Sequence, residues 1–525
     1  METSLSGSKP ASTFTSLNPA TGETIGTFGI ATASEVRGAV AVAKFVQQKW
    51  AREPISHRIE VLKRFQQVLA LRKEEVAALI SAEAGKPVVE ALTSEILVVL
   101  DAARFCTENV YKTMREEAMG MGNLAMAGKR GRLVFEPIGV VGIIAPWNYP
   151  FSIPAVDALA ALVLGNGVVL KPSELTPACG HKLQTLLMES GLPAGLFQVV
   201  DGFGETGAAL ITAGVDKIIF TGSVPTGRLV GAACAEQLVP CVLELGGKDA
   251  MLVLEDADVD VASSAAVWGS MMNAGQTCIS VERCFVHRSI FDEFLDACVD
   301  KVRALRVGNG ADPHSDVGPM ISQRQLEIVE RQVLHAVEEG AHAVCGGHRL
   351  PDLGANFFAP TVVTNIPADA PLWCEETFGP VLAIMPFDSE AEAIARANAS
   401  EFGLSASVWT RNKRRGEQVA RQIQAGAVLV NDLLTSFGIS EAPHGGVKAS
   451  GIGRTHGLLG MRELVRPKFI SVERLPSMKQ PWWYGYNPLL GPQMAGFVDF
   501  LFGKGLRKRL RGAWQSRATI FRKRL

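Results

Sequence analysis

Residues 140–245 alternate short, continuous apolar runs with segments of helical character. The apolar runs cover residues 140–145, 167–170, 196–200, 217–220 and 242–245. Runs of this length between helices are typical of parallel strands that are buried on both faces. The order therefore predicts a doubly wound α/β sheet, which binds its ligands at the carboxyl ends of the strands.

The same alternation restarts after Gly247. Strands are expected at 250–254, 283–287, 358–362, 381–386, 406–410 and 427–431, with helices at 258–272, 290–304, 389–398 and 413–424. This half predicts a second α/β domain. Before the first sheet, Thr32 and Glu35 form a capping-box pattern that opens a helix running to about Trp50. Two more helices are expected at about 56–83, with a break, and at 87–118.

The composition narrows the class of protein. The chain has 525 residues, of which 47% are hydrophobic and 20% charged, so two or three globular domains are expected. Nine cysteines stand without any CxxC pair, so neither a zinc site nor a redox dithiol is suggested. Their odd number and the lack of a secretory signal predict free thiols in a reducing, cytoplasmic compartment. No apolar run is long enough to cross a membrane.

Cys278 lies among small and polar residues, directly after the helix expected to end near Met272. A cysteine exposed at such a junction can act as a nucleophile once its thiol loses the proton. The alternative is a buried structural cysteine, which is the commoner fate of a single cysteine in a long chain.

Two other side chains suit a covalent cysteine enzyme. Glu244 interrupts an apolar strand and precedes two glycines, and a buried glutamate has a raised pKa that suits a general base. Asn148 lies between Pro146 and Pro150 at the end of the first strand, where its amide could donate to a developing oxyanion. A structural carboxylate and a turn-forming asparagine are the alternatives.

Three features could bind phosphates or a ribose. Residues 202–207 match G-x-G-x-x-G after the third strand, although a plain glycine turn is the favoured explanation, because a chain with 52 glycines matches this pattern easily by chance. Gly222 and Ser223 lie in a second glycine loop, before a helix whose first N–H groups could receive a pyrophosphate. Lys171 and Glu174 end the second strand, where they would face the ligand cleft or form a solvated ion pair.

Six segments in the same order resemble the aldehyde dehydrogenase superfamily. They are residues 146–150, 171–174, 220–223, 243–248, 275–278 and 376–380, and the resemblance covers about residues 15–475. It implies that Cys278 attacks the aldehyde and forms a thiohemiacetal. The oxyanion would lie between the Asn148 amide and the Cys278 backbone N–H. After hydride transfer to the nicotinamide, Glu244 would activate water to hydrolyse the thioester.

The resemblance also assigns the cofactor. Lys171 and Glu174 would hold the adenosine ribose, and Glu376 and Phe378 the nicotinamide ribose and ring. The pyrophosphate would lie near Gly222 and Ser223, with Trp147 on the cofactor side, so the G-x-G-x-x-G match becomes a turn. Glu174 favours NAD, and NADP remains an alternative. Relatives that transfer the acyl group to coenzyme A lack the glutamate, so Glu244 implies a free acid as product. No metal is expected.

By resemblance the chain has a Rossmann-like cofactor domain (10–113 and 135–246) and an α/β catalytic domain (247–440). A small β-rich bridging element (114–134 and 455–475) is expected to pair subunits into a homodimer or homotetramer. Residues 476–525 exceed the usual family length. Because the last 25 residues carry nine basic side chains and no acid, the rest of the chain is net acidic, and a nucleic-acid partner is not supported.

The tail and the substrate stay open. Apolar and aromatic residues between Met494 and Trp514 recur at helical spacing among basic ones, which predicts either a helix on an anionic membrane surface or one packed on protein. His444 stands where the family has an aromatic residue. The aldehyde tunnel is assigned to Tyr149, Ile153, Val156, Thr277, Ile279 and Phe437. These residues favour a medium- or long-chain aliphatic or an aromatic aldehyde over succinic semialdehyde. A non-catalytic, membrane-associated scaffold of the same fold is the competing function.

Overall fold

The first apolar stretch forms a six-stranded sheet of order β17-β9-β8-β5-β6-β7. Its strands are β5 (Val140–Ile144), β6 (Gly167–Lys171), β7 (Phe197–Val199), β8 (Lys217–Thr221), β9 (Cys241–Glu244) and β17 (Gly451–Ile452). All are parallel except β17, which runs antiparallel to β9. The order reverses at β5, because β6 and β7 extend to one side and β8 and β9 to the other. The expected doubly wound sheet is thus confirmed.

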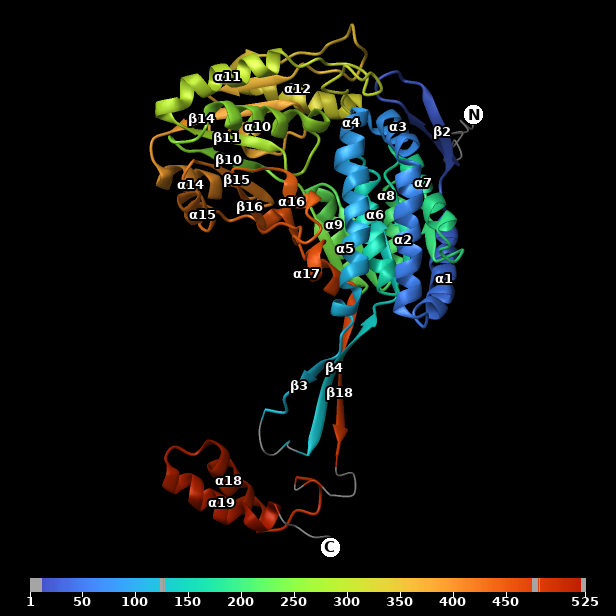
Figure 1. Ribbon diagram of the computed structural model, residues 1–525, viewed down its shortest axis with the longest axis vertical. Helices are drawn as coiled ribbons and strands as arrows, with labels where there is room; N and C mark the ends of the chain where they lie inside the picture. Colours follow the sequence, from blue (N-terminus) through green and yellow to red (C-terminus); the bar gives the residue numbers. More distant parts are fainter. Residues whose placement is uncertain (1–11, 123–125, 127, 475–479, 481, 521–525) are drawn as a thin grey trace, which may run out of the picture. The chain divides into compact units, whose positions relative to one another are not determined.

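Helices cover both faces of this sheet (Figure 1). On one face, β5 residues Val140 and Ile144 share a core with α1 (Ala33–Trp50), α8 (Gly204–Thr212) and α9 (Val224–Glu236). Every residue of α6 (Ser152–Val163) is buried, because it packs against β5 and β6 and is covered by further helices. Those that contact it are α2 (Ile55–Leu71) and α5 (Leu97–Thr113), and α7 (Pro177–Glu189) follows β6.

The second sheet has seven strands in the order β12-β13-β14-β11-β10-β15-β16. They are β10 (Asp249–Val253), β11 (Val281–His287), β12 (His342–Cys345), β13 (Thr361–Thr364), β14 (Val381–Phe387), β15 (Ser405–Trp409) and β16 (Ala427–Val430). Only the edge strand β12 is antiparallel. The second α/β layer expected from the sequence is present, whereas β12 was not expected, because its short exposed run has no distinctive pattern.

Side chains of β10 alternate between two cores. Met251 and Val253 face α10 (Val259–Met271), α11 (Phe291–Arg303) and α12 (Gln323–Glu338). Ala250 and Leu252 face α14 (Glu390–Asn398) and α15 (Lys413–Ala420), on the opposite side of the sheet in Figure 1. The helix α12 was not predicted, although its apolar residues recur at helical spacing.

The N-terminal helices differ from expectation at their ends. The segment expected as one broken helix is α2 and α3 (Lys73–Ala84), divided at Arg72. The helix expected over 87–118 is wrong in extent: α4 (Val88–Glu90), a π-helical turn (Ala91–Ile96) and α5 end at Thr113. The chain then leaves this unit and forms β3 (Glu117–Met119).

The computed structural model describes residues 12–122, 126, 128–474, 480 and 482–520. Its contacts divide the chain into two units, one formed by residues up to Thr113 with 137–465 and the other by 114–136 with 466–525. The expected bridging segment 455–475 therefore begins later, because 455–465 belong to the first unit, where they include α17 (Gly457–Arg462). The ends of the expected tail, 476–479, 481 and 521–525, lie outside the described residues.

The second unit holds a three-stranded sheet and a helical hairpin. The sheet has the order β18-β4-β3, with β4 (Lys129–Pro137) and β18 (Val465–Glu473). The single tail helix expected from the apolar spacing is wrong: α18 (Leu490–Phe502) and α19 (Leu506–Ile520) are separated at Gly503 and at Gly505, whose φ is 87°. Among the described residues no helix has the length and hydropathy needed to cross a bilayer.

Candidate active site

The carboxyl edge of the first sheet gathers most of the residues singled out from the sequence. Asn148 follows β5, Lys171 is the last residue of β6, Ser223 follows β8, and Glu244 is the last residue of β9. Because these strands are parallel neighbours, their ends lie along one edge. This edge, where the strand order reverses, is where open α/β sheets bind ligands.

The second sheet contributes the opposite ends of its strands. Cys278 lies just before β11, and Glu376 and Phe378 lie just before β14, the strand that pairs with β11. The nucleophile candidate and the residues expected at the nicotinamide therefore come from neighbouring loops at the amino edge of this sheet.

Several hydrogen bonds join these edges within the first unit, and two of them lie next to Cys278. The Asn148 side-chain Nδ2 donates to the Gln276 carbonyl at 3.1 Å. The Tyr149 hydroxyl lies 2.8 Å from the Thr277 Oγ1. The loop after β5 is thus bonded to the residues immediately before Cys278.

The loop that carries Cys278 has an unusual backbone. Asn273, Ala274 and Gly275 have φ values of 53°, 54° and 72°. Residues other than glycine rarely adopt such positive values. A Cβ on Gly275 would lie 1.9 Å from the Gly379 carbonyl oxygen, so only glycine fits there. Such strained turns persist only where the surroundings hold them, and here Asn273 donates through Nδ2 to the Asn148 carbonyl at 3.0 Å.

The Cys278 thiol is not ionised in this environment. The residue is partly buried, and burial, followed by the carboxylates of Glu376, Asp249 and Glu244, raises the thiol's pKa well above its ordinary value. A base, or a change of local charge on ligand binding, is needed before this thiol can attack.

Glu244 is 5% exposed and only weakly bonded. Its Oε1 accepts a long hydrogen bond from the Thr455 hydroxyl at 3.5 Å, and no described residue bonds its buried Oε2. Burial, followed by the nearby charge of Asp157, raises the pKa of Glu244 well above its ordinary value. Both effects favour the protonated form of the carboxyl.

His444 is buried beside this carboxyl, with its Nε2 4.0 Å from the Glu244 Oε2. Burial lowers the pKa of His444 to about 4, so the imidazole is neutral and no ion pair forms at physiological pH. Its ring packs edge-on against Phe437 at a centroid distance of 5.1 Å. The histidine thus takes a packing role next to the base.

The residues assigned to a dinucleotide border the same junction. Lys171 Nζ donates to Glu174 Oε2 at 3.2 Å, and Ser223 is the N-cap residue of α9, with an exposed side chain. Glu376 Oε1 accepts from the Gly247 N–H at 3.1 Å. The Gly222 N–H donates to the carbonyl of Glu244 at 3.0 Å.

An aromatic pair lies between the two sheets. The rings of Trp147 and Phe378 meet edge to face, with centroids 5.4 Å apart and an interplanar angle of 88°. Phe378 has a φ of 54°, so its backbone is held in a conformation that a phenylalanine rarely adopts. Trp147 follows β5 of the first sheet and Phe378 precedes β14 of the second, so the pair joins the loops of the two sheets.

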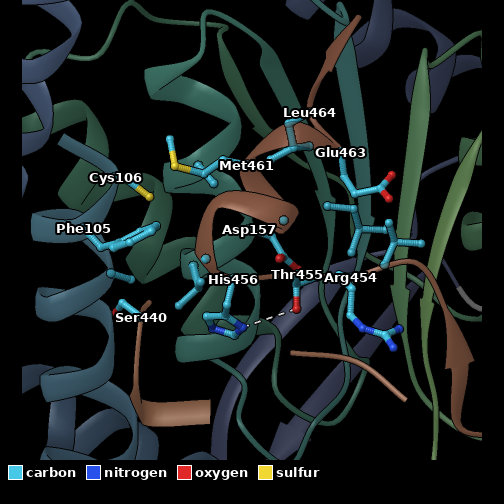
Figure 2. A pocket seen from close by; sticks show the side chains of 17 residues that line it. Phe105, Cys106, Asp157, Ser440, Arg454, Thr455, His456, Met461, Glu463 and Leu464 are labelled. Atoms are coloured by element: carbon cyan, nitrogen blue, oxygen red, sulfur yellow. Dashed lines mark hydrogen bonds between the residues drawn. The ribbon is translucent and has the colours of Figure 1, made fainter. Parts of the chain in front are cut away.

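The structure places the expected tunnel residues in two groups. Tyr149, Ile153 and Ile279 are buried in one cluster, against which Cys278 and Phe437 pack. Thr277 is bonded to Tyr149, as described above. Val156 instead is one of the residues that line a small cavity. Asp157, the next residue of α6, also lines it and is labelled in Figure 2.

Buried charges that the sequence did not single out hold these loops. The Lys86 ammonium pairs with Glu95 at 2.6 Å and donates to the Asn148 carbonyl at 2.7 Å. The other oxygen of Glu95 accepts from the N–H groups of Phe151 and Ser152, each at 2.9 Å. Only the unusual occurrence of charges in otherwise buried helices could have suggested them.

A second buried pair holds the opposite loop. Lys248 pairs with Glu282, whose carboxylate also accepts from the backbone N–H groups of Thr377 and Phe378. Glu90 plays a similar part at the cysteine loop, where it accepts from the Asn273 N–H at 2.9 Å. Within the described part of the chain, no group of three His, Cys, Asp or Glu side chains is placed to hold a metal ion.

Comparison with known proteins gives one consistent result. The sequence model of the aldehyde dehydrogenase family matches residues 6–470. A 4,4'-diapolycopene aldehyde oxidase of a Methylomonas species is 38% identical over 94% of this chain and 92% of its own length. A provisionally named succinate-semialdehyde dehydrogenase (NADP+) of Mycolicibacterium smegmatis is 38% identical, with 88% and 89% covered. The crystal structure of an NAD-dependent aldehyde dehydrogenase from Sinorhizobium meliloti superimposes with a TM-score of 0.86 and 35% identity, covering 90% and 93%.

Proposed function

The chain belongs to the aldehyde dehydrogenase family, and we propose that it oxidises a lipophilic aldehyde to the free carboxylic acid through a thioester on Cys278. It is an oxidoreductase of the NAD(P)-dependent class acting on aldehydes. The observation that carries the mechanism is the meeting of two sheet edges, because it sets Asn148 and Glu244 from one sheet beside the Cys278 loop of the other.

The Cys278 thiol first gives its proton to a base, and the thiolate sulfur then bonds to the aldehyde carbon. The carbonyl oxygen becomes an oxyanion, which the Asn148 Nδ2 and the Cys278 backbone N–H stabilise. In the free protein the Nδ2 donates to the Gln276 carbonyl, so it must turn from that carbonyl to the substrate. A nicotinamide cofactor held near Glu376 and Phe378 would supply the hydride acceptor that turns this adduct into a thioester on Cys278.

Glu244 then removes a proton from water, whose oxygen bonds to the thioester carbon while the bond to sulfur breaks. Its environment supports this role, because a carboxyl with a raised pKa holds a proton tightly and is a strong base when ionised. The unpaired Oε2 gives that carboxyl a free acceptor for the attacking water.

The side chains at the junction fit a dinucleotide. Glu174 is a carboxylate at the carboxyl end of β6, where it can accept from ribose hydroxyls and would repel a 2′-phosphate, which supports NAD over NADP. Ser223 opens α9, whose first N–H groups can receive a pyrophosphate. The half-buried Glu376 carboxylate suits the second ribose, beside the Phe378 ring.

The substrate proposal rests on the apolar character of the expected tunnel. Tyr149, Ile153, Ile279 and Phe437 share one apolar cluster with Cys278, and none of them carries a charge. This favours a medium- or long-chain aliphatic or an aromatic aldehyde over a semialdehyde with a second carboxylate. Succinic semialdehyde is the alternative substrate. Because the chain is similar to a protein named as a succinate-semialdehyde dehydrogenase, the assay below includes it.

A spectrophotometric assay of NADH or NADPH formation tests this proposal. The panel pairs decanal and benzaldehyde with succinic semialdehyde, for wild type, Cys278→Ala and Cys345→Ala. Cys345 lies on the edge strand β12 and serves as the matched cysteine control. We expect Cys278→Ala to abolish turnover and Cys345→Ala to leave it unchanged. We also expect wild type to have a higher kcat/KM for the lipophilic aldehydes than for succinic semialdehyde. Turnover by Cys278→Ala would contradict the covalent mechanism. A higher kcat/KM for succinic semialdehyde would contradict the proposed substrate class. Wild-type protein that is folded but turns over none of these aldehydes would favour the alternative function, a non-catalytic scaffold.

The three-stranded sheet supports assembly into a homodimer or homotetramer. Its edge strand β18 exposes Phe469, Ile470 and Val472 at fractions of 54%, 41% and 53%. A long edge strand with exposed apolar side chains is a ready surface for pairing with another chain. Light scattering on the eluted protein is expected to give a dimer or tetramer, and Ile470→Lys is expected to shift it toward the monomer. A monomeric wild type would contradict this.

The helical hairpin of α18 and α19 supports binding to an anionic membrane surface. The helices approach each other at Gly496 and Gly512, which leaves larger side chains facing outward. The exposed apolar residues are Leu489, Val498, Phe502, Leu506, Leu510 and Trp514. Exposed basic residues lie among them: Lys504, Arg507, Lys508, Arg509, Arg511 and Arg517. A surface with aromatic, aliphatic and basic side chains suits the headgroup region of acidic lipids.

Co-sedimentation of the full chain with vesicles tests this surface. Binding to vesicles that contain phosphatidylserine, but not to pure phosphatidylcholine, is expected and should weaken with salt. Arg507→Glu with Arg511→Glu should abolish it, whereas the matched reversal of Lys413 and Arg414 on α15 should not. Equal loss in both double variants, or no binding by wild type, would favour a hairpin packed on protein. A cytoplasmic location fits the nine free cysteines.

A further inference from the structure

A buried ammonium contacts the loop that carries the proposed oxyanion donor. The side chains of Lys86 and its partner Glu95 are both fully buried, and the carboxylate lies 2.6 Å from the Lys86 Nζ. The same Nζ donates to the backbone carbonyl of Asn148 at 2.7 Å and lies 3.8 Å from the centre of the Tyr149 ring. One cation therefore contacts two consecutive residues of the loop that follows β5.

Both of these residues are also bonded to the loop that carries the proposed nucleophile. The Asn148 Nδ2 donates to the Gln276 carbonyl at 3.1 Å, and the Tyr149 hydroxyl lies 2.8 Å from the Thr277 Oγ1. Gln276 and Thr277 directly precede Cys278 in the chain. The ammonium thus contacts the same two residues that hydrogen bonds join to the Cys278 loop.

The Asn148 carbonyl oxygen accepts from two donors. Besides the Lys86 Nζ, the Asn273 Nδ2 donates to it at 3.0 Å. A carbonyl oxygen has two lone pairs, so both of its acceptor positions are used. The peptide group between Asn148 and Tyr149 is thereby held, while the Asn148 side chain can still turn its amide toward a substrate.

A π-helical turn brings two carboxylates to this network. Glu90 directly precedes the turn (Ala91–Ile96) and Glu95 lies within it, and one backbone hydrogen bond of the segment spans five residues. In an α-helix, residues five apart point about 140° away from each other. The i→i+5 bonding of a π-helical turn brings them closer to one side, and such turns occur frequently at functional sites. Here Glu95 pairs with Lys86, and Glu90 Oε2 accepts from the Asn273 N–H at 2.9 Å.

We propose that Lys86 is a positioning residue for the oxyanion donor, because it holds the peptide group of Asn148 at the distance from Cys278 that lets the Asn148 amide reach the oxyanion. The inference rests on the proposed function, since it concerns the same covalent chemistry. The ammonium contacts Glu95, the Asn148 carbonyl and the Tyr149 ring, so it acts through Asn148 and not on the substrate. A misplacement of about 1 Å in such a group can lower a rate by about 10²-fold.

The hydrogen bond to Asn148 distinguishes this pair from one that serves stability alone. A buried ion pair is by itself weak evidence for any role, because the cost of desolvation offsets much of the attraction. If the pair served stability alone, its replacement would change unfolding but not the rate of one particular chemical step. The positioning role predicts a loss in the step that forms the oxyanion.

The test replaces the pair without leaving a buried charge. Lys86→Met combined with Glu95→Gln removes both charges, and the glutamine can still accept from the Phe151 and Ser152 N–H groups. Glu95→Gln alone keeps the Lys86 hydrogen bond to the Asn148 carbonyl, so it should lose less activity than the double variant. Circular dichroism and the dissociation constant for NAD check that each variant is folded.

The readout is the single-turnover rate of NADH formation, measured by stopped flow with enzyme in excess over decanal. The double variant is expected to lower this rate by about 10- to 10²-fold, with little change in the dissociation constant for NAD. The same double substitution in an Asn148→Ala background should lower the rate by less than about threefold, because the donor that Lys86 positions is already absent.

Equal losses in the two backgrounds would overturn the positioning role, because they would show that the pair acts independently of the Asn148 amide. An unchanged rate in the folded double variant would also overturn it. If the double variant does not fold, Glu95→Gln is carried through the same comparison, and equal losses with and without Asn148 again overturn the proposal. Absence of Cys278-dependent NADH formation in wild type would instead overturn the proposed function on which this inference rests.

Discussion

The side-chain amide of Asn148 donates a hydrogen bond to the carbonyl of Gln276 at 3.1 Å, two residues before Cys278. The two residues come from different sheets and are far apart in the sequence. This hydrogen bond therefore joins the carboxyl edge of one sheet to the amino edge of the other. It also holds the Asn148 amide on one side of the Cys278 loop.

Asn148→Ala tests whether this amide stabilises the oxyanion. We expect kcat/KM to fall by about 10²- to 10³-fold, as when one oxyanion donor is lost elsewhere, with little change in the dissociation constant for NAD. Asn148→Ser keeps a donor on a shorter side chain and is the graded control. Its kcat/KM should lie between that of wild type and that of Asn148→Ala. Stopped-flow kinetics locate the effect, and a loss confined to NAD binding would contradict the assignment.

Glu244→Gln should separate acylation from hydrolysis. Because glutamine cannot take a proton from water, we expect a burst of NADH of about one equivalent, followed by a steady rate that is lower by about 10²-fold or more. Mass spectrometry of the quenched protein should show the acyl group on Cys278. A steady rate close to wild type would rule out Glu244 as the base.

The pH dependence of the wild type follows from two raised pKa values. Burial raises the pKa values of both Cys278 and Glu244, which favours the protonated form of each group in the free protein. The thiolate and the carboxylate form as the pH rises, and kcat/KM should therefore increase from pH 6 to pH 9. A kcat/KM that declines over this range would show that neither group limits the reaction.

Stability should respond to Asp157 with a defined sign. Its pKa is about 7 in the folded protein and about 3.9 in the unfolded chain, so both states are protonated below pH 4 and the folded state carries no penalty. Stability is lost as the pH rises from about 4 to about 7, because the unfolded chain ionises there while the buried carboxyl keeps its proton. Asp157→Asn should therefore raise the free energy of unfolding at pH 8, by up to about 4 kcal/mol, and change little at pH 4. Urea unfolding at both values checks this, and equal effects at both would contradict it.

Glu282→Gln should weaken cofactor binding from a distance. The Glu282 carboxylate accepts from the Thr377 and Phe378 N–H groups and pairs with Lys248, so its loss leaves an unpaired buried cation. Breaking such a pair costs about 3–5 kcal/mol of stability. The KM for NAD should rise more than that for the aldehyde, because the loop before β14 loses its anchor. Glu330→Gln, at an ion pair near the surface, is the control. It should change neither the stability nor the KM for NAD appreciably.

Glu174→Thr tests the choice of dinucleotide. Removing the carboxylate should raise kcat/KM for NADP relative to NAD by at least tenfold, because the repulsion of a 2′-phosphate is lost. Parallel assays with the two cofactors measure the ratio. No change in the ratio would show that another group discriminates between them.

The sequence by itself determined the two α/β sheets, the family, and which residues stand at strand ends. Apolar runs between helices indicate buried strands, because a strand covered on both faces seldom carries polar side chains. The motifs around Asn148, Glu244 and Cys278 lie at or just beyond the ends of such strands. Only the tertiary structure decided that Lys86, Glu95 and Glu282 hold the site loops, that Asp157 and Thr455 border one cavity, and that the tail folds as two helices. Those features depend on which distant segments meet, since the partner and the burial of a charge are set by packing and not by its neighbours in the chain.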